Sequence, residues 1–112
     1  MSKFQECIDT YKAEFKKLDV SFDEELLVKV AKGCGPSIYN KDARTVSGTD
    51  EAEVATVKNN FLIKKLGLED GPALDSAIAE VIEVFGSANR NKYRAMFYYL
   101  LTKKFNKEEI YN

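Results

Sequence analysis

The chain has 112 residues, of which 45% are hydrophobic and 31% charged, a balance typical of a folded globular protein rather than a disordered one. This length predicts a single domain over residues 1–112, with a core large enough to need no disulfide or metal. Lys and Arg number 17 and Asp and Glu 18, so the net charge of -1 favours neither a nucleic-acid-binding nor a membrane-surface protein. Histidine is absent, which excludes imidazole bases and histidine-ligated zinc.

The two cysteines, Cys7 and Cys34, are too few for a disulfide framework and lack the spacing of a zinc site. We expect them to be reduced thiols, and we expect no cofactor. The first residues lack the apolar stretch of a signal peptide, and the longest apolar run, residues 95–101, is far shorter than a bilayer requires. The sequence therefore predicts a cytoplasmic protein without membrane contact.

Apolar residues recur with helical spacing along nearly the whole chain. A first helix carries its apolar stripe over residues 4–18. A second begins at a capping box formed by Ser21 and Glu24 and ends at the glycines and proline of 33–36, which allow at most one more irregular turn. Residues 36–49 show no strong period, although 42–46 are compatible with one turn.

Capping residues and glycines divide the second half of the chain into three further helices. The third runs from Asp50 to Leu66, where Gly67 suits a left-handed cap. The fourth begins at Pro72 and ends at Gly86. The fifth is capped by Ser87 or Asn89, and residues 106–112 form a short tail. The predicted buried stripe of the fifth helix consists of Tyr93, Met96 or Phe97, Leu100, Leu101 and Phe105.

These elements predict an all-α fold, a compact bundle of about five helices with no sheet. The segments KDARTVSGTD (41–50), EV (53–54) and NFLIKKLGL (60–68) together resemble a family of small bacterial proteins catalogued only as a domain of unknown function. The resemblance covers about residues 3–105. It implies a small helical cytosolic protein of bacterial origin and brings no established activity, cofactor or partner.

Basic residues gather near the start of the fifth predicted helix. Free backbone N–H groups at a helix start, together with arginines, suit an anion. The candidate anion or ligand site therefore comprises Ser87, Asn89, Arg90, Lys92 and Arg94. Alternatively, the fourth and fifth helices form an antiparallel hairpin in which acidic and basic side chains neutralise one another. This hairpin places Glu80 beside Arg94, and it places Glu69 and Asp70 beside Lys103 and Lys104.

Two further groups of residues are candidates for binding. Tyr98 and Tyr99 cannot both share the buried stripe of the fifth helix, so at least one is expected on the surface, where tyrosine suits a partner interface. In the polar segment 41–50, side chains that can bond backbone N–H groups at turns and caps are favoured as structural residues; they are Asp42, Ser47, Thr49 and Asp50. The alternative is a site for a small ligand or partner peptide formed by Lys41, Ser47, Asn60 and Lys64. Asn60 is the most suggestive of these, since asparagine is a poor choice in the middle of a helix without a side-chain partner.

No catalytic or metal-binding constellation emerges, and the chain is expected not to be an enzyme. The favoured interpretation is an uncharacterised, non-enzymatic module that binds a protein partner or associates with itself. The alternative is a nucleic-acid or anion binder acting through the basic fifth helix, which the neutralising hairpin disfavours.

Overall fold

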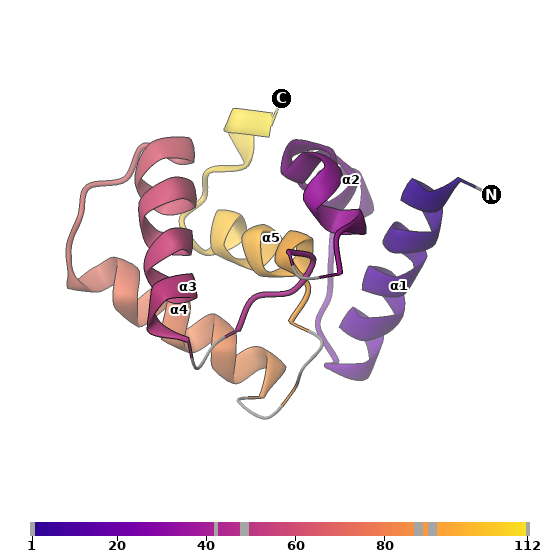
Figure 1. Cartoon of the computed structure of the whole chain (residues 1–112), viewed down its shortest axis with the longest axis horizontal. Helices are drawn as coiled ribbons and strands as arrows, with labels where there is room; N and C mark the ends of the chain where they lie inside the picture. Colours follow the sequence, from indigo (N-terminus) through magenta and orange to yellow (C-terminus); the bar gives the residue numbers. More distant parts are fainter. Residues whose placement is uncertain (1, 42, 48–49, 87–88, 90–91, 112) are drawn as a thin grey trace.

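The computed structural model describes residues 2–41, 43–47, 50–86, 89 and 92–111. In that part of the chain the fold is all-α, with five α-helices, no strand and 73% of residues helical, as the sequence predicts (Figure 1). The α-helices are α1 (Lys3–Lys17), α2 (Glu24–Cys34), α3 (Glu51–Thr56), α4 (Pro72–Phe85) and α5 (Arg94–Lys104). Two 3-10 turns, η1 (Gly35–Tyr39) and η3 (Glu108–Tyr111), and a π-helix, η2 (Val57–Lys65), complete the fold.

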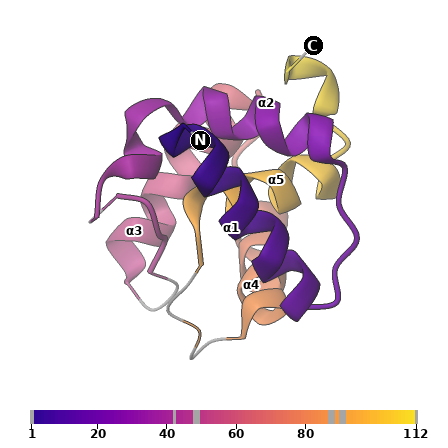
Figure 2. The same cartoon turned by 90° about the vertical axis from the view of Figure 1, so that its right-hand side faces the viewer.

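Helix α5 lies at the centre, with α2 and α4 packed against it (Figures 1 and 2). Its buried residues point in several directions, which is typical of a helix surrounded by other elements. They are Ala95, Met96, Phe97, Tyr99, Leu101 and Thr102. The prediction of a single stripe that includes either Met96 or Phe97 is therefore wrong, because both side chains are fully buried.

Local capping signals position most helix ends as predicted. The side chain of Asp50 accepts the backbone N–H groups of Ala52 and Glu53 at the start of α3, and Gly67 takes the left-handed conformation at φ 71°. Helix α2 is an exception, because Asp23, not Ser21, caps it by accepting the N–H of Glu25 at 3.0 Å. The backbone N–H of Asp23 itself donates to the Tyr99 hydroxyl at 2.7 Å, which anchors this cap to α5.

Helix α5 begins later than predicted, at Arg94, and Asn89 does not cap it. An isolated antiparallel bridge between Thr45 and Tyr93 explains the delay. The N–H of Val46 donates to the Lys92 carbonyl at 2.8 Å, and the N–H of Arg94 donates to the Arg44 carbonyl at 2.7 Å. Residues 92–93 are thus held extended by the segment that precedes α3. The alternative cap Ser87, and Asp42 of the predicted turn at 42–46, lie outside the described residues.

The third predicted helix is not α-helical throughout. It continues from α3 into the nine-residue π-helix η2, whose end is marked by the N–H of Leu66 donating to the Phe61 carbonyl five residues back at 2.9 Å. Helices of this kind are rare and usually limited to one turn, frequently at functional sites. This irregularity forms one wall of the cleft described next.

Candidate functional site

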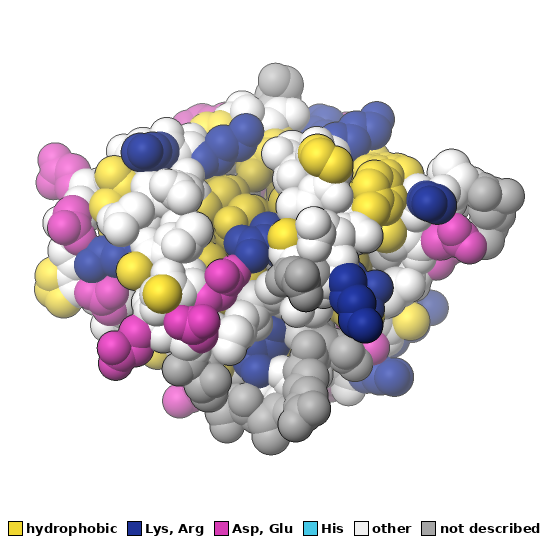
Figure 3. Space-filling model, viewed as in Figure 1, with side chains coloured by type: hydrophobic (Ala, Val, Ile, Leu, Met, Phe, Trp, Pro, Cys, Tyr) yellow, Lys and Arg dark blue, Asp and Glu magenta, His cyan; other side chains and the backbone are white. Residues whose placement is uncertain are grey.

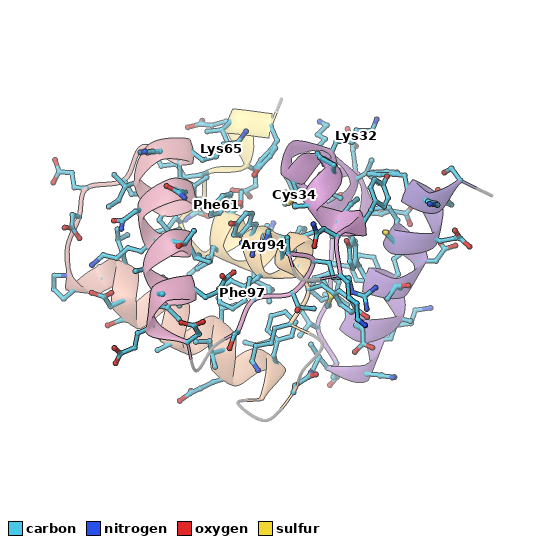
Figure 4. All side chains as sticks on the ribbon, in the orientation of Figure 1. Lys32, Cys34, Phe61, Lys65, Arg94 and Phe97 are labelled. Atoms are coloured by element: carbon cyan, nitrogen blue, oxygen red, sulfur yellow. The ribbon has the colours of Figure 1, made fainter. Side chains whose placement is uncertain are left out.

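A cleft of about 400 Å³ opens between the C-terminal turn of α2, the π-helix η2, the first turns of α5 and the turn η3. On the face shown in Figure 3, hydrophobic side chains gather in the middle of the molecule with Lys and Arg side chains around them. Figure 4 shows Cys34 on α2, Phe61 and Lys65 on η2, and Arg94 between these two elements. The cleft is therefore assembled from segments that are far apart in the sequence.

The π-helical register forms the η2 wall. Thr56 and Phe61, and likewise Asn60 and Lys65, are five residues apart, and all four line the cleft. Bonds that span five residues bring such pairs onto one face. In an α-helix, at about 100° per residue, residues five apart would point about 140° away from each other. In a regular α-helix, therefore, only two of these four side chains would face the cleft.

The floor of the cleft is aromatic. The rings of Phe61 and Tyr98 stack with centroids 3.9 Å apart and an interplanar angle of 8°. Tyr98 is partly buried, and burial raises the pKa of its hydroxyl, although the adjacent Arg94 opposes that shift. Phe61 is 3% exposed, so the stack presents mainly the partly exposed Tyr98 ring, which suits an aromatic or aliphatic side chain.

Arg94 is fixed in place by three partners from different segments. Its Nε donates to the Ala43 carbonyl at 2.7 Å, its Nη1 donates to the Tyr98 hydroxyl at 2.9 Å, and its Nη2 pairs with the Glu53 carboxylate. The guanidinium thus joins the segment before α3, α3 itself and α5. Because Glu53 neutralises much of its charge, Arg94 mainly shapes the cleft.

Lys65 supplies the accessible positive charge at the mouth. It is exposed, and within the described ranges it takes part in no ion pair. Its Nζ lies 5.3 Å from the centroid of the Tyr111 ring. No Asp or Glu belongs to the described cleft lining, so the mouth favours an anion over a cation.

The thiol of Cys34 also lines the cleft and is partly buried. Burial raises its pKa to about 11, with Arg94 and Lys65 opposing the shift. The thiol is therefore protonated at neutral pH, whereas a reactive cysteine is a thiolate. Within the described part of the chain, no three Cys, Asp or Glu residues come together to hold a metal ion.

The structure describes three of the five residues of the predicted anion site, namely Asn89, Lys92 and Arg94. Arg94 lies in the cleft, but Lys92 is buried, its Nζ donates to the Asn89 carbonyl, and burial lowers its pKa. Asn89 in turn donates its side-chain amide to the Phe85 carbonyl at 3.1 Å. Ser87 and Arg90 lie outside the described residues. The described members are thus engaged within the chain.

The two tyrosines differ in exposure. Tyr98 is partly exposed and contributes to the cleft, as the prediction that at least one is exposed requires. Tyr99 is 1% exposed, and its ring packs edge-on against the Phe15 ring with centroids 5.4 Å apart. Tyr99 therefore belongs to the core rather than to a partner surface. Its hydroxyl is the acceptor for the Asp23 N–H, which explains why a tyrosine is accommodated there.

The predicted polar cluster is divided. Asn60 lines the cleft, whereas Lys41, Ser47 and Lys64 are exposed and do not. Asn60, which the sequence singled out, thus lies at the cleft, but with neighbours other than those predicted. The residues missed were Thr56, Phe61, Lys65 and Tyr111, since their grouping depends on the π register and on the path of the tail.

The predicted pairing of charges between α4 and α5 is mostly wrong. Arg94 pairs with Glu53 on α3 instead of Glu80. Glu80 instead meets Lys104, at 2.5 Å, which does link α4 to α5. Asp70 pairs with Lys58 at 3.0 Å and Lys103 with Glu108 at 3.4 Å. The basic side chains of α5 are thus neutralised by three different elements, because α5 lies at the centre of the fold.

Comparison with protein families supports the resemblance to a family of unknown function. The family model "Protein of unknown function (DUF2853)" matches residues 10–109, most of the chain. The chain belongs to the DUF2853 family. No curated protein matches it. The range matched to DUF2853 contains every cleft-lining residue from Gly33 to Tyr98, whereas Tyr111 lies beyond it. Among the described helices, none has the length and apolar character needed to cross a membrane.

Proposed function

We propose that this DUF2853 protein is a non-enzymatic interaction module that binds an acidic segment of a partner protein in the cleft. The observation that carries the proposal is the lining itself: an aromatic floor and cationic side chains, with no carboxylate among the described lining residues. Negative charge on a partner would be attracted to Lys65, and an apolar side chain would rest on the Phe61–Tyr98 stack.

The size and chemistry of the cleft support a binding role. About 400 Å³ is at the small end of ligand sites and accommodates one or two side chains. The chain has no histidine, which excludes histidine-based catalytic pairs, and the Cys34 thiol in the cleft is held protonated. These features support binding without chemistry.

The test is fluorescence anisotropy with short labelled peptides that carry one aromatic residue flanked by glutamates. A matched set has glutamine in place of glutamate. We expect the glutamate peptides to bind at least about tenfold tighter, because only they carry charge toward Lys65. We expect Lys65→Glu to abolish that preference, whereas Lys16→Glu, an equal charge change on an exposed residue of α1, retains it.

Three results would overturn the proposal. The first is equal binding of the glutamate and glutamine peptides, and the second is equal behaviour of the Lys65 and Lys16 variants. The third is tighter binding of labelled oligonucleotides, with an affinity that collapses between about 50 and 200 mM salt, which would instead identify a nucleic-acid binder.

A further inference from the structure

The C-terminal turn η3 folds back over the cleft instead of leaving the molecule. Asn106 takes a left-handed conformation at φ 55°, and the N–H of Lys107 donates to the Thr102 carbonyl at 3.0 Å. This reversal directs η3 back toward α2, against which it packs. In Figure 1 the turn lies between the upper ends of η2 and α2.

Tyr111 enters the cleft between one residue of α2 and one of η2. A Cβ on Gly33 would lie 3.1 Å from Cε1 of the Tyr111 ring, so the ring rests against bare backbone there. On the η2 side, the Lys65 ammonium approaches the same ring to 5.3 Å. The ring is therefore held by a cation and by a glycine that leaves room for it.

The composition of η3 matches the chemistry that the cleft would attract. Its sequence is Glu108, Glu109, Ile110 and Tyr111, an aromatic residue close to two carboxylates. Glu109 is exposed, and Glu108 pairs with Lys103 at 3.4 Å. The chain thus contains its own segment of the type proposed for the partner, and that segment already occupies part of the cleft.

We infer that η3 is a built-in competitor for the cleft, and that the partner segment places an aromatic side chain, with carboxylates beside it, where Tyr111 now lies. This inference rests on the proposed function and adds to it the ligand class and an autoinhibitory contact. Within the described residues, η3 is held by the partly buried side chains of Tyr111 and Ile110, by the Lys65 ammonium over the Tyr111 ring, by hydrogen bonds to Thr102 and by a surface ion pair. Such weak contacts are readily exchanged for those of a second, similar segment.

The magnitude follows from the population of the open state. When a competing segment closes the site, the apparent affinity falls by the fraction of molecules that are open. An η3 turn docked in about nine molecules of ten would weaken partner binding about tenfold. Removal of the Tyr111 ring is expected to raise the apparent affinity for the partner segment about tenfold.

The experiment measures anisotropy of a labelled peptide, acetyl-Glu-Glu-Ile-Tyr-amide, against the full chain. We expect Tyr111→Ala to bind it about tenfold tighter than the unaltered chain. Tyr39→Ala is the matched control, because Tyr39 is 46% exposed and lies outside the cleft lining, and it should leave the affinity unchanged. Adding Lys65→Glu to Tyr111→Ala should remove the binding.

The outcomes separate this inference from the proposed function. If Tyr111→Ala binds the peptide no more tightly than the unaltered chain, while Lys65→Glu still weakens binding, η3 is not a competitor. The proposed site for an acidic segment would then be retained. No binding by either protein would overturn both. A peptide with alanine in place of tyrosine that binds equally well would refute the aromatic requirement. A light-scattering mass above the monomer that depends on Tyr111 would instead place η3 in the cleft of a second copy.

Discussion

Replacing Arg94 with methionine tests whether one guanidinium joins three segments of this fold. Methionine retains most of the aliphatic stem and removes the charged head. The change deletes the bonds to the Ala43 carbonyl and the Tyr98 hydroxyl, and it deletes the ion pair with Glu53. The backbone N–H of residue 94 still donates to the Arg44 carbonyl, so the bridge that starts α5 is retained.

The expected cost follows from the burial of the lost partners. A hydrogen bond to a charged group contributes about 1.5–3 kcal/mol, and removing one member of a buried ion pair costs about 3–5 kcal/mol. The side chains of Arg94 and Glu53 retain 13% and 27% exposure, so water partly solvates the carboxylate left behind. We therefore expect Arg94→Met to lower the free energy of unfolding by about 2–3 kcal/mol, which is about 10 °C in Tm for a chain of this size.

Urea denaturation followed by circular dichroism at 222 nm measures this change. Arg44→Met is the matched control, because Arg44 is exposed, and it should cost less than about 0.5 kcal/mol. Glu53→Gln should be less harmful in the Arg94→Met background than alone, by about 1 kcal/mol of coupling. A loss for Arg94→Met as small as that of the control, or additive effects in the cycle, would refute the role assigned to the guanidinium.

Three further predictions test local features. Asp23→Ala should lower the free energy of unfolding, measured in urea, by about 1 kcal/mol, because Asp23 caps α2. Ser21→Ala should have almost no effect, and equal effects of the two changes would contradict the assignment of the cap. Gly67→Ala should cost about 1–2 kcal/mol because φ is 71°. Gly71→Ala, at an extended φ of 170°, should cost only about 0.5 kcal/mol, the preference for glycine over alanine at an N-cap, and equal losses would show that the left-handed conformation is not the cause. The alkylation rate of Cys34, measured with iodoacetamide in a Cys7→Ala background, should rise steeply only as the pH approaches the thiol pKa of about 11, and fast reaction at pH 7 would contradict the buried, protonated thiol.

The candidate site was only partly accessible to sequence reasoning. Asn60 stood out as an unfavourable residue within a helix, and it does line the cleft. Tyr98 and Arg94 were candidates for other reasons and also lie there. Lys65 and Tyr111 carried no such signal, because an exposed lysine on a helix and a tyrosine in a tail are ordinary in sequence terms. Only their approach to one another, seen in the structure, makes them candidates.

What the sequence by itself determined is local. The helical period predicts an all-α fold, the Asp50 cap predicts the start of α3, and Pro72 and Gly86 bracket α4, since these signals act within one or two turns of the backbone. Tertiary structure decided the π register of η2, the late start of α5 and the burial of Tyr99. The start of α5 depends on the distant bridge to Thr45, and the position of Tyr99 depends on the distant Asp23 N–H, because a buried helix takes the register and orientation that satisfy its neighbours rather than its own propensities.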